Sequence, residues 1–156
     1  MVHFIRTAAL DYETTTFYQL QVTITDNGSP ATSSAVDLDV TITNVNEGAP
    51  VFTLGTYSVT VPEDTSLGSN LLTVTTSDVD HDTVTYSFQT AYSNFIIDPS
   101  SGAILLAQTL DYDTTQTHSL LVVASDGTAT TTATTSIDVT DVNESPVFAT
   151  TTYTYV

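Results

Sequence analysis

Hydrophobic and polar residues alternate along much of this chain. Every second residue is hydrophobic in residues 18–24 and again in residues 36–42, with Gln, Thr and Asp between them. This period of two is typical of β-strands that bury one face. The same signal predicts seven further strands, near residues 56–61, 70–76, 83–88, 94–97, 103–107, 117–124 and 132–140.

Turn sequences separate the predicted strands. Asp98–Gly102 and Asp26–Pro30 combine Asp, Gly, Pro and Ser, which are the residues that favour turns. The Thr-rich stretch 128–135 lies where a strand is expected, and we interpret it as a solvated β-edge rather than low-complexity sequence. Seven strands between such turns predict an all-β sandwich.

The chain repeats itself. Residues 10–13 (Leu-Asp-Tyr-Glu) return as residues 110–113 (Leu-Asp-Tyr-Asp), and residues 44–52 return as residues 141–148. This spacing predicts one domain per repeat: residues 1–48 form the C-terminal part of one repeat, residues 49–144 a complete repeat, and residues 145–156 the first strand of the next. We expect the chain to be a slice of a longer array, with the repeated acidic clusters holding metal between its modules.

Composition narrows the class of partner. There are 18 acidic residues against a single basic one, Arg6, and the formal net charge is −17. Such a chain repels nucleic acid and anionic membrane surfaces, so cations are its natural partners. Hydrophobic residues still make up 40% of the chain, which is enough for a core. There is no cysteine, and no apolar run is long enough to cross a membrane.

Catalysis is not expected. Asp11 and Glu13 could be interpreted as the acid and base of a glycosidase, but the cluster has too many carboxylates and no apolar setting to raise one pKa. The three histidines follow no zinc spacing, and His118 is expected to be packed or half-buried. No phosphate-binding loop or nucleophile motif is present in the sequence.

The ordered motifs resemble the extracellular cadherin repeat. They run from Pro62-Glu63 through Asp78-Val79-Asp80, Asp98–Gly102, Asp111–Asp113 and Asp126-Gly127 to Asp141–Phe148. The resemblance implies a seven-stranded Greek-key, immunoglobulin-like sandwich in a tandem array, with one complete repeat and a partial repeat on either side. It also implies calcium ions at the junctions between repeats, held by carboxylate and carbonyl oxygens.

The resemblance assigns candidate calcium ligands to two junctions. At the first junction, one site is matched by Asn46, the Gly48 carbonyl, Asp78, Asp80 and Asp126. A more upstream pair of sites is matched by Asp11, Glu13, Asn44, Glu47 and again Asp80, and the Pro-Glu glutamate expected to join them precedes Met1. At the second junction the matching residues are Glu63, Asp111, Asp113, Asp141 and Glu144. The site of Asn143 would be completed by the Asp-x-Asp motif of the next repeat, which is expected beyond Val156.

Some positions depart from the family pattern. Asn44 stands where Asp is usual and removes one charge from the first junction, Glu47 and Glu144 replace the linker Asp, and Asp113 replaces Glu. We therefore expect weaker binding at the upstream pair of the first junction. We expect the tightest ion at the site of Asn46, Asp78, Asp80 and Asp126.

The function implied by the resemblance is calcium-dependent, homophilic cell adhesion by an extracellular part of a membrane-anchored protein. Its partners would be calcium, other cadherin-like repeats of the same chain, and a homophilic or heterophilic adhesion partner, but not nucleic acid. The alternative is a structural stalk repeat of a large microbial or invertebrate surface adhesin, suggested by the Thr-rich, Lys-poor surface. Asn27 is the more reasonable of two N-glycosylation sequons, since the other uses Asn143.

The sequence of the first 48 residues also predicts an uncovered apolar face. The hydrophobic rows of residues 18–24 and 36–42 lack the facing sheet that would cover them, and exposed aliphatic rows and free strand edges favour association. We expect this part of the chain either to self-associate or to be mobile.

Overall fold

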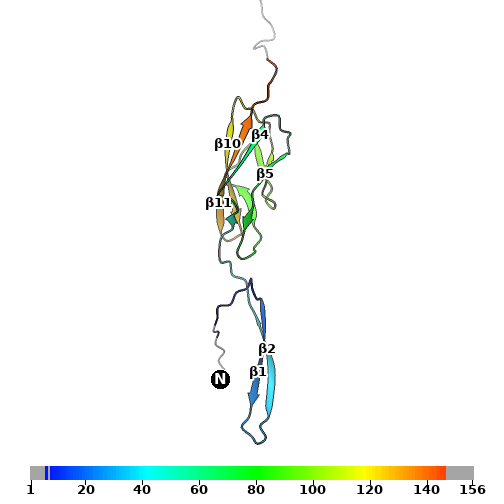
Figure 1. Cartoon of the computed structure of the whole chain (residues 1–156), viewed down its shortest axis with the longest axis vertical. Coiled ribbons are helices and arrows are strands. Elements are labelled where there is room, and N and C mark those ends of the chain that lie inside the picture. Colours follow the sequence, from blue (N-terminus) through cyan, green and yellow to red (C-terminus); the bar gives the residue numbers. More distant parts are fainter. Residues whose placement is uncertain (1–5, 7, 147–156) are drawn as a thin grey trace, which may run out of the picture. The chain divides into compact units, whose positions relative to one another are not determined.

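The computed structural model describes Arg6 and residues 8–146 and contains two compact units. Unit 1 takes in the chain up to Gly48 together with the loop Val79–Asp82, and unit 2 takes in Ala49–Asp78 and the chain from Thr83 onward. Unit 1 is thus assembled from residues on both sides of Ala49. Figure 1 labels the main strands of both units.

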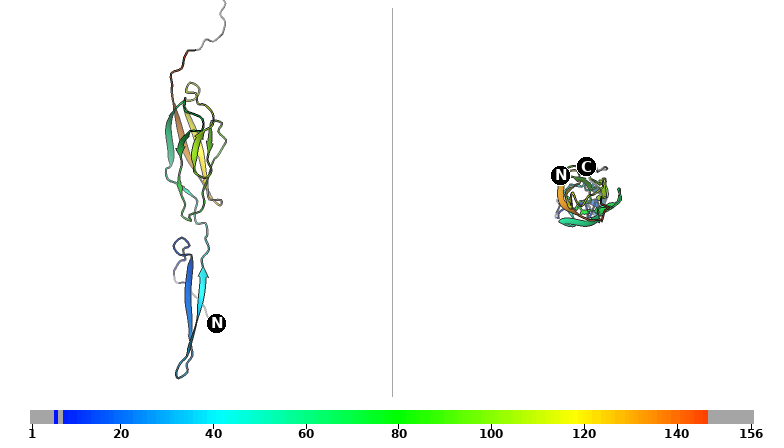
Figure 2. Two further views of the ribbon diagram at one scale, coloured as in Figure 1. Left: turned by 90° about the vertical axis from the view of Figure 1, so that its right-hand side faces the viewer. Right: turned by 90° about the horizontal axis from the view of Figure 1, so that it is seen from above.

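Unit 1 contains a long β-hairpin. Its strands are β1 (Phe17–Thr25) and β2 (Ser33–Thr41), which pair antiparallel with Leu20 opposite Leu38. The hydrophobic row is poorly covered in the described part of the chain: Leu20 is 42% exposed and Ile24 67%. In Figures 1 and 2 the hairpin stands as a two-stranded ribbon. Its apolar face is therefore largely open to solvent.

Unit 2 is a sandwich built from four- and three-stranded sheets with a small two-stranded ladder. The first sheet has the order β4-β11-β10-β7, the second β5-β9-β8, and the ladder pairs β3 with β6. β4 runs parallel to β11, whereas the other pairs are antiparallel. The strands are β3 (Val51–Phe52), β4 (Thr56–Pro62), β5 (Asn70–Thr73), β6 (Thr76–Ser77), β7 (Thr85–Phe88), β8 (Phe95–Ile97), β9 (Ala103–Leu106), β10 (Thr117–Ser125) and β11 (Thr130–Thr140).

The core of unit 2 follows the alternation seen in the sequence. Along β10 the residues Leu120, Val122 and Ala124 are at most 1% exposed, and the first two belong to the same hydrophobic cluster as Ile104 and Leu106 of β9. Burying an aliphatic side chain of this size stabilises the fold by roughly 1.5–3 kcal/mol. The sandwich therefore has an apolar core of its own that involves no metal.

The predicted strands are observed with some differences. The Thr-rich stretch 128–135 is not the solvated β-edge that we expected, because β11 lies between β4 and β10 and Thr135 is fully buried. The single strand expected at 70–76 is interrupted, because the chain leaves the sheet of β5 after Thr73 and joins β3 as β6. At this break Val74 donates its N–H to the Gly102 carbonyl (3.0 Å), and a Cβ on Gly102 would lie 2.4 Å from the Val74 carbonyl oxygen. Gly102 also has a φ of +71°, a left-handed conformation that favours glycine, so this close approach of Gly102 to Val74 requires glycine.

Secondary structure in the described residues consists of strands, turns and loops. No helix long and apolar enough to cross a membrane is found among them. The first strand of a further repeat, predicted for 145–156, falls almost entirely outside the described residues.

Candidate metal centre

Two equivalent turns carry the Leu-Asp-Tyr motifs. Thr14 donates its backbone N–H to Asp11 Oδ1 (3.0 Å) and its hydroxyl to Oδ2 (2.7 Å), and Thr114 makes the same pair of bonds to Asp111 (3.1 and 2.8 Å). These bonds favour the charged carboxylate and lower the pKa of Asp11. The aspartate of each motif therefore fixes the turn that carries the next acidic residue, Glu13 or Asp113.

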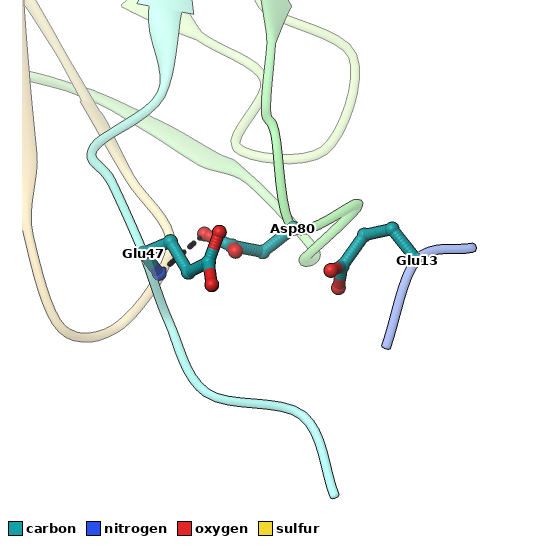
Figure 3. Close-up of side chains that lie close together, drawn as sticks. All are labelled: Glu13, Glu47 and Asp80. Atoms are coloured by element: carbon teal, nitrogen blue, oxygen red, sulfur yellow. Dashed lines mark hydrogen bonds between the residues drawn. The ribbon is translucent and has the colours of Figure 1, made fainter. Parts of the chain in front are cut away.

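Three carboxylates from distant parts of the sequence converge in unit 1. Glu13, Glu47 and Asp80 each offer a carboxylate oxygen, and these oxygens lie within 4.8 Å of one another. Figure 3 shows the side chains pointing toward one another from three separate stretches of chain. Like charges at this separation repel by about 1 kcal/mol per pair in water, and by several times more in a partly buried site.

Asp80 is the best buried member of this cluster. Its side chain is only 4% exposed, and its Oδ2 accepts the backbone N–H groups of Glu47 (2.9 Å) and Gly48 (3.2 Å). Asp80 thereby holds the linker that follows β2 against its own loop. The Oε1 atom of Glu13 is buried and has no hydrogen-bond partner among the described residues. A buried carboxylate oxygen without a donor is costly unless a cation meets it.

The loop Asp78–Asp82 supplies a second group. Within unit 1, an oxygen of Asp82 also lies within 4.8 Å of an oxygen of Asp80. Asp82 accepts the side-chain amides of both linker asparagines, from Asn44 to Oδ1 (3.3 Å) and from Asn46 to Oδ2 (3.4 Å). The sequence analysis did not name Asp82, although the alternating Asp-x-Asp-x-Asp spacing was a signal that could have found it.

Unit 2 has an acidic centre of its own around Glu63. This side chain is 8% exposed, and its two oxygens accept the backbone N–H groups of Tyr112 (2.7 Å) and Val142 (2.8 Å). Glu63 therefore fastens the Leu-Asp-Tyr turn to the segment that follows β11. A pocket of roughly 390 Å³ opens beside it, with Asp111 and Glu144 among its lining residues.

Negative charges surround Glu144 at this second centre. The negative charge of Glu63 raises the pKa of Glu144 most, followed by desolvation and by the charges of Asp113, Asp141 and Asp111. Four of the acidic residues that the sequence assigns to the second junction thus act on the fifth, Glu144. A bound cation would relieve this repulsion.

The complete repeat matches a known protein family. Residues 57–140, more than half of the chain, match the family model of the Cadherin domain. The chain belongs to the cadherin family. Its match includes β4 to β11 and the loop that carries Asp80.

Curated relatives are large cadherins. The chain is 42% identical to human Protocadherin-16 over 142 residues and 39% identical to Protein dachsous of Drosophila melanogaster over 145 residues. Each alignment covers 86% of this chain but only 4% of the relative. The chain therefore spans a small fraction of the relatives that it matches.

Solved structures agree with the fold. The extracellular domain of Protocadherin GammaB4 matches with a TM-score of 0.74 and 33% identity, over 86% of this chain and 21% of that one. Mouse Cadherin-23 EC22-24 matches with a TM-score of 0.76 and 26% identity, over 86% of this chain and 46% of that one. The immunoglobulin-like cadherin sandwich is confirmed, and the chain belongs to a family of extracellular adhesion receptors rather than to one of enzymes.

One predicted ligand of this cadherin segment has a visible local role. Asp126 Oδ1 accepts the N–H groups of Thr128 and Ala129, at 2.7 Å each, in the turn between β10 and β11. Asp26, the equivalent residue of unit 1, accepts the N–H groups of Gly28 and Thr32 between β1 and β2, and these bonds lower its pKa. The equivalent position thus shapes a hairpin turn in both copies of the repeat.

Proposed function

We propose that this chain is a calcium-binding segment of the extracellular part of a cadherin-type, membrane-anchored adhesion protein. The observation that carries the proposal is the convergence of Glu13, Glu47 and Asp80, with a buried Glu13 oxygen that lacks a hydrogen-bond donor. These residues come from three stretches of chain, and a cation would offset the repulsion among their carboxylates. The residue set fits calcium, which prefers several carboxylate and carbonyl oxygens.

The proposal assigns two groups of ligands. The first group joins the Leu-Asp-Tyr turn, the linker and the Asp78–Asp82 loop; its members are Asp11, Glu13, Asn44, Asn46, Glu47, Gly48, Asp78, Asp80 and Asp126. The second group surrounds the buried Glu63; its other members are Asp111, Asp113, Asp141 and Glu144. Bound calcium would supply the positive charge that offsets the mutual repulsion of each group.

The mechanical role follows from where the ligands lie in the sequence. Asp80 comes 32 residues after Gly48, yet it holds the backbone of the linker at Glu47 and Gly48 through hydrogen bonds. Added coordination by Glu13 and Glu47 would restrict the same linker further. We propose that the chain serves as a calcium-stiffened spacer in homophilic cell adhesion. The proposed repeats are a partial one in residues 1–48, a complete one in residues 49–144 and the start of a third in residues 145–156.

The stalk of a microbial or invertebrate surface adhesin is the weaker hypothesis. The relatives named above are cadherins and protocadherins, which supports adhesion between cells. Aggregation of cells that display this chain on their surface would test for a homophilic partner.

Thermal unfolding in calcium and in a chelator tests the proposal. We expect calcium to raise the melting temperature, because a ligand at a hundredfold excess over its Kd stabilises the native state by about 2.7 kcal/mol. Asp80→Asn should lose most of this gain. Asp39→Asn removes a carboxylate that accepts Gln19 Nε2 in the hairpin (3.2 Å), and should behave like the parent chain.

Two outcomes of this experiment would contradict the proposal. A melting temperature that is the same in millimolar calcium and in chelator would show that the acidic clusters are merely solvated. An equal response of Asp80→Asn and Asp39→Asn would move the calcium site away from the cluster.

A further inference from the structure

Asp82 lies between the side-chain amides of two linker residues. Asn44 donates to its Oδ1 (3.3 Å) and Asn46 donates to its Oδ2 (3.4 Å), and all three residues belong to unit 1. Asp82 and Asn46 are both half-buried. The carboxylate therefore engages one asparagine with each of its oxygens.

The chemistry of this contact fixes which way the amides face. An ionised carboxylate can only accept hydrogen bonds, and an amide can donate only through its NH2 group. Asn44 and Asn46 must therefore present Nδ2 to Asp82, which turns each carbonyl oxygen Oδ1 away from it. The carbonyl oxygen is the end of an asparagine that calcium binds, whereas the NH2 end is repelled.

An asparagine ligand has to be oriented, whereas an aspartate ligand does not. A carboxylate offers an oxygen at both ends and binds a cation however it is flipped, but an amide offers an oxygen at one end only. Asn44 stands where the family pattern has Asp, so this junction depends on the orientation of an amide. Asp82 supplies a fixed acceptor for that amide and for its neighbour Asn46.

We infer that Asp82 is a positioning residue that holds Asn44 and Asn46 with their carbonyl oxygens turned toward the cation. This inference rests on the proposed calcium site and assigns Asp82 a role that the ligand motifs do not contain. Partners that orient metal ligands commonly contribute 10- to 100-fold to metal affinity. The effect should appear in calcium affinity and, independently, in the calcium-free protein.

The variant Asp82→Asn tests the inference on the whole chain. It keeps the shape of the side chain but can flip to present its own NH2 group, so it no longer fixes the two amides. We expect calcium affinity, measured by calorimetry, to fall about tenfold. In calcium-free protein we expect the side-chain NH2 signals of Asn44 and Asn46 to shift in nitrogen-proton NMR spectra.

A matched control lies in the hairpin. Asp37 accepts Gln21 Nε2 at 3.4 Å, so Asp37→Asn removes an equivalent bond from the same unit. It should shift the signal of Gln21 and leave calcium affinity unchanged. A second background, Asn44→Ala with Asn46→Ala, removes the amides that Asp82 positions, and there Asp82→Asn should cost less than twofold.

The outcomes separate the possible failures. If Asp82→Asn leaves both affinity and the two asparagine signals unchanged, the inference is overturned while the calcium site stands. If it still costs tenfold without Asn44 and Asn46, Asp82 acts as a ligand and the positioning role is wrong. If the parent chain binds no calcium, the proposed function fails, and the calcium-free spectra still decide whether Asp82 holds the two amides.

Discussion

At the scale of single residues, the carboxylates of this chain have two different roles. Asp26 and Asp98 accept hydrogen bonds within their own turns. Glu13 and Asp80 instead belong to a cluster of acidic groups from distant parts of the sequence. Both roles use the same residue types, so only the contacts distinguish a turn cap from a metal ligand.

Asp98 provides a prediction for the first role. Its Oδ1 accepts the backbone N–H and hydroxyl groups of Ser100 and Ser101, and these bonds lower its pKa to about 2. Because the folded pKa of Asp98 lies below the ordinary aspartate value of 3.8, the stabilisation is present above pH 4 and is lost as the pH falls toward 2. NMR titration of the Asp98 carboxyl carbon should show a midpoint near 2.

The matched variant is Asp98→Asn, which keeps an oxygen acceptor but cannot titrate. Its stability relative to the parent chain should improve as the pH falls from 4 to 2. A titration midpoint of Asp98 close to that of an unstructured aspartate would contradict the observed hydrogen bonds.

Sequence motifs predicted most residues of the candidate site but not Asp82. Repetition made Asp11, Glu13 and their later counterparts stand out, because two copies in register are hard to explain as solvated loops. Asp82 has no second copy in the chain, and its role depends on the asparagines 36 and 38 residues earlier. No local pattern could have predicted that contact.

At the scale of elements, alternation predicted the long strands and missed the short ones. β10 and β11 bury every second residue, as the sequence indicated. β3 and β6 have two residues each, too few to show any period, and they exist because Val51 and Phe52 pair with Ser77 and Thr76, more than 20 residues later. Such short ladders follow from tertiary packing rather than from propensity.

The repeat provides a matched pair of leucines for testing the core. Leu120 in β10 is 1% exposed, whereas Leu20 at the equivalent place in β1 is 42% exposed. We expect Leu120→Ala to lower the free energy of unfolding by about 2–5 kcal/mol because it leaves a cavity. Leu20→Ala should cost less than about 1 kcal/mol, since solvent already reaches the side chain.

Chemical denaturation of the two variants measures this difference. Equal losses would show that the β1–β2 face is covered in solution, by a second copy of the chain or by another segment. The self-association or mobility expected of this hairpin from the sequence stays a prediction, and the same experiment at several protein concentrations addresses it.

At the scale of the whole molecule, charge is the dominant feature. A net charge of −17 on 156 residues opposes compaction, and much of it is concentrated in the two acidic centres. The sandwich has an apolar core and should keep its β-sheet circular dichroism without metal. The acidic centres have no such core, and their order should depend on a cation.

Calorimetric titration of the chain with calcium is the most direct test of this account. We predict saturable binding of more than one ion per chain, with most of it lost in Asp80→Ala because Asp80 lies beside Glu13 and Glu47 and also beside Asp82. Magnesium, which demands a tighter octahedral shell, should compete poorly. The absence of saturable heat with calcium, or an unchanged titration of Asp80→Ala, would contradict the central claim.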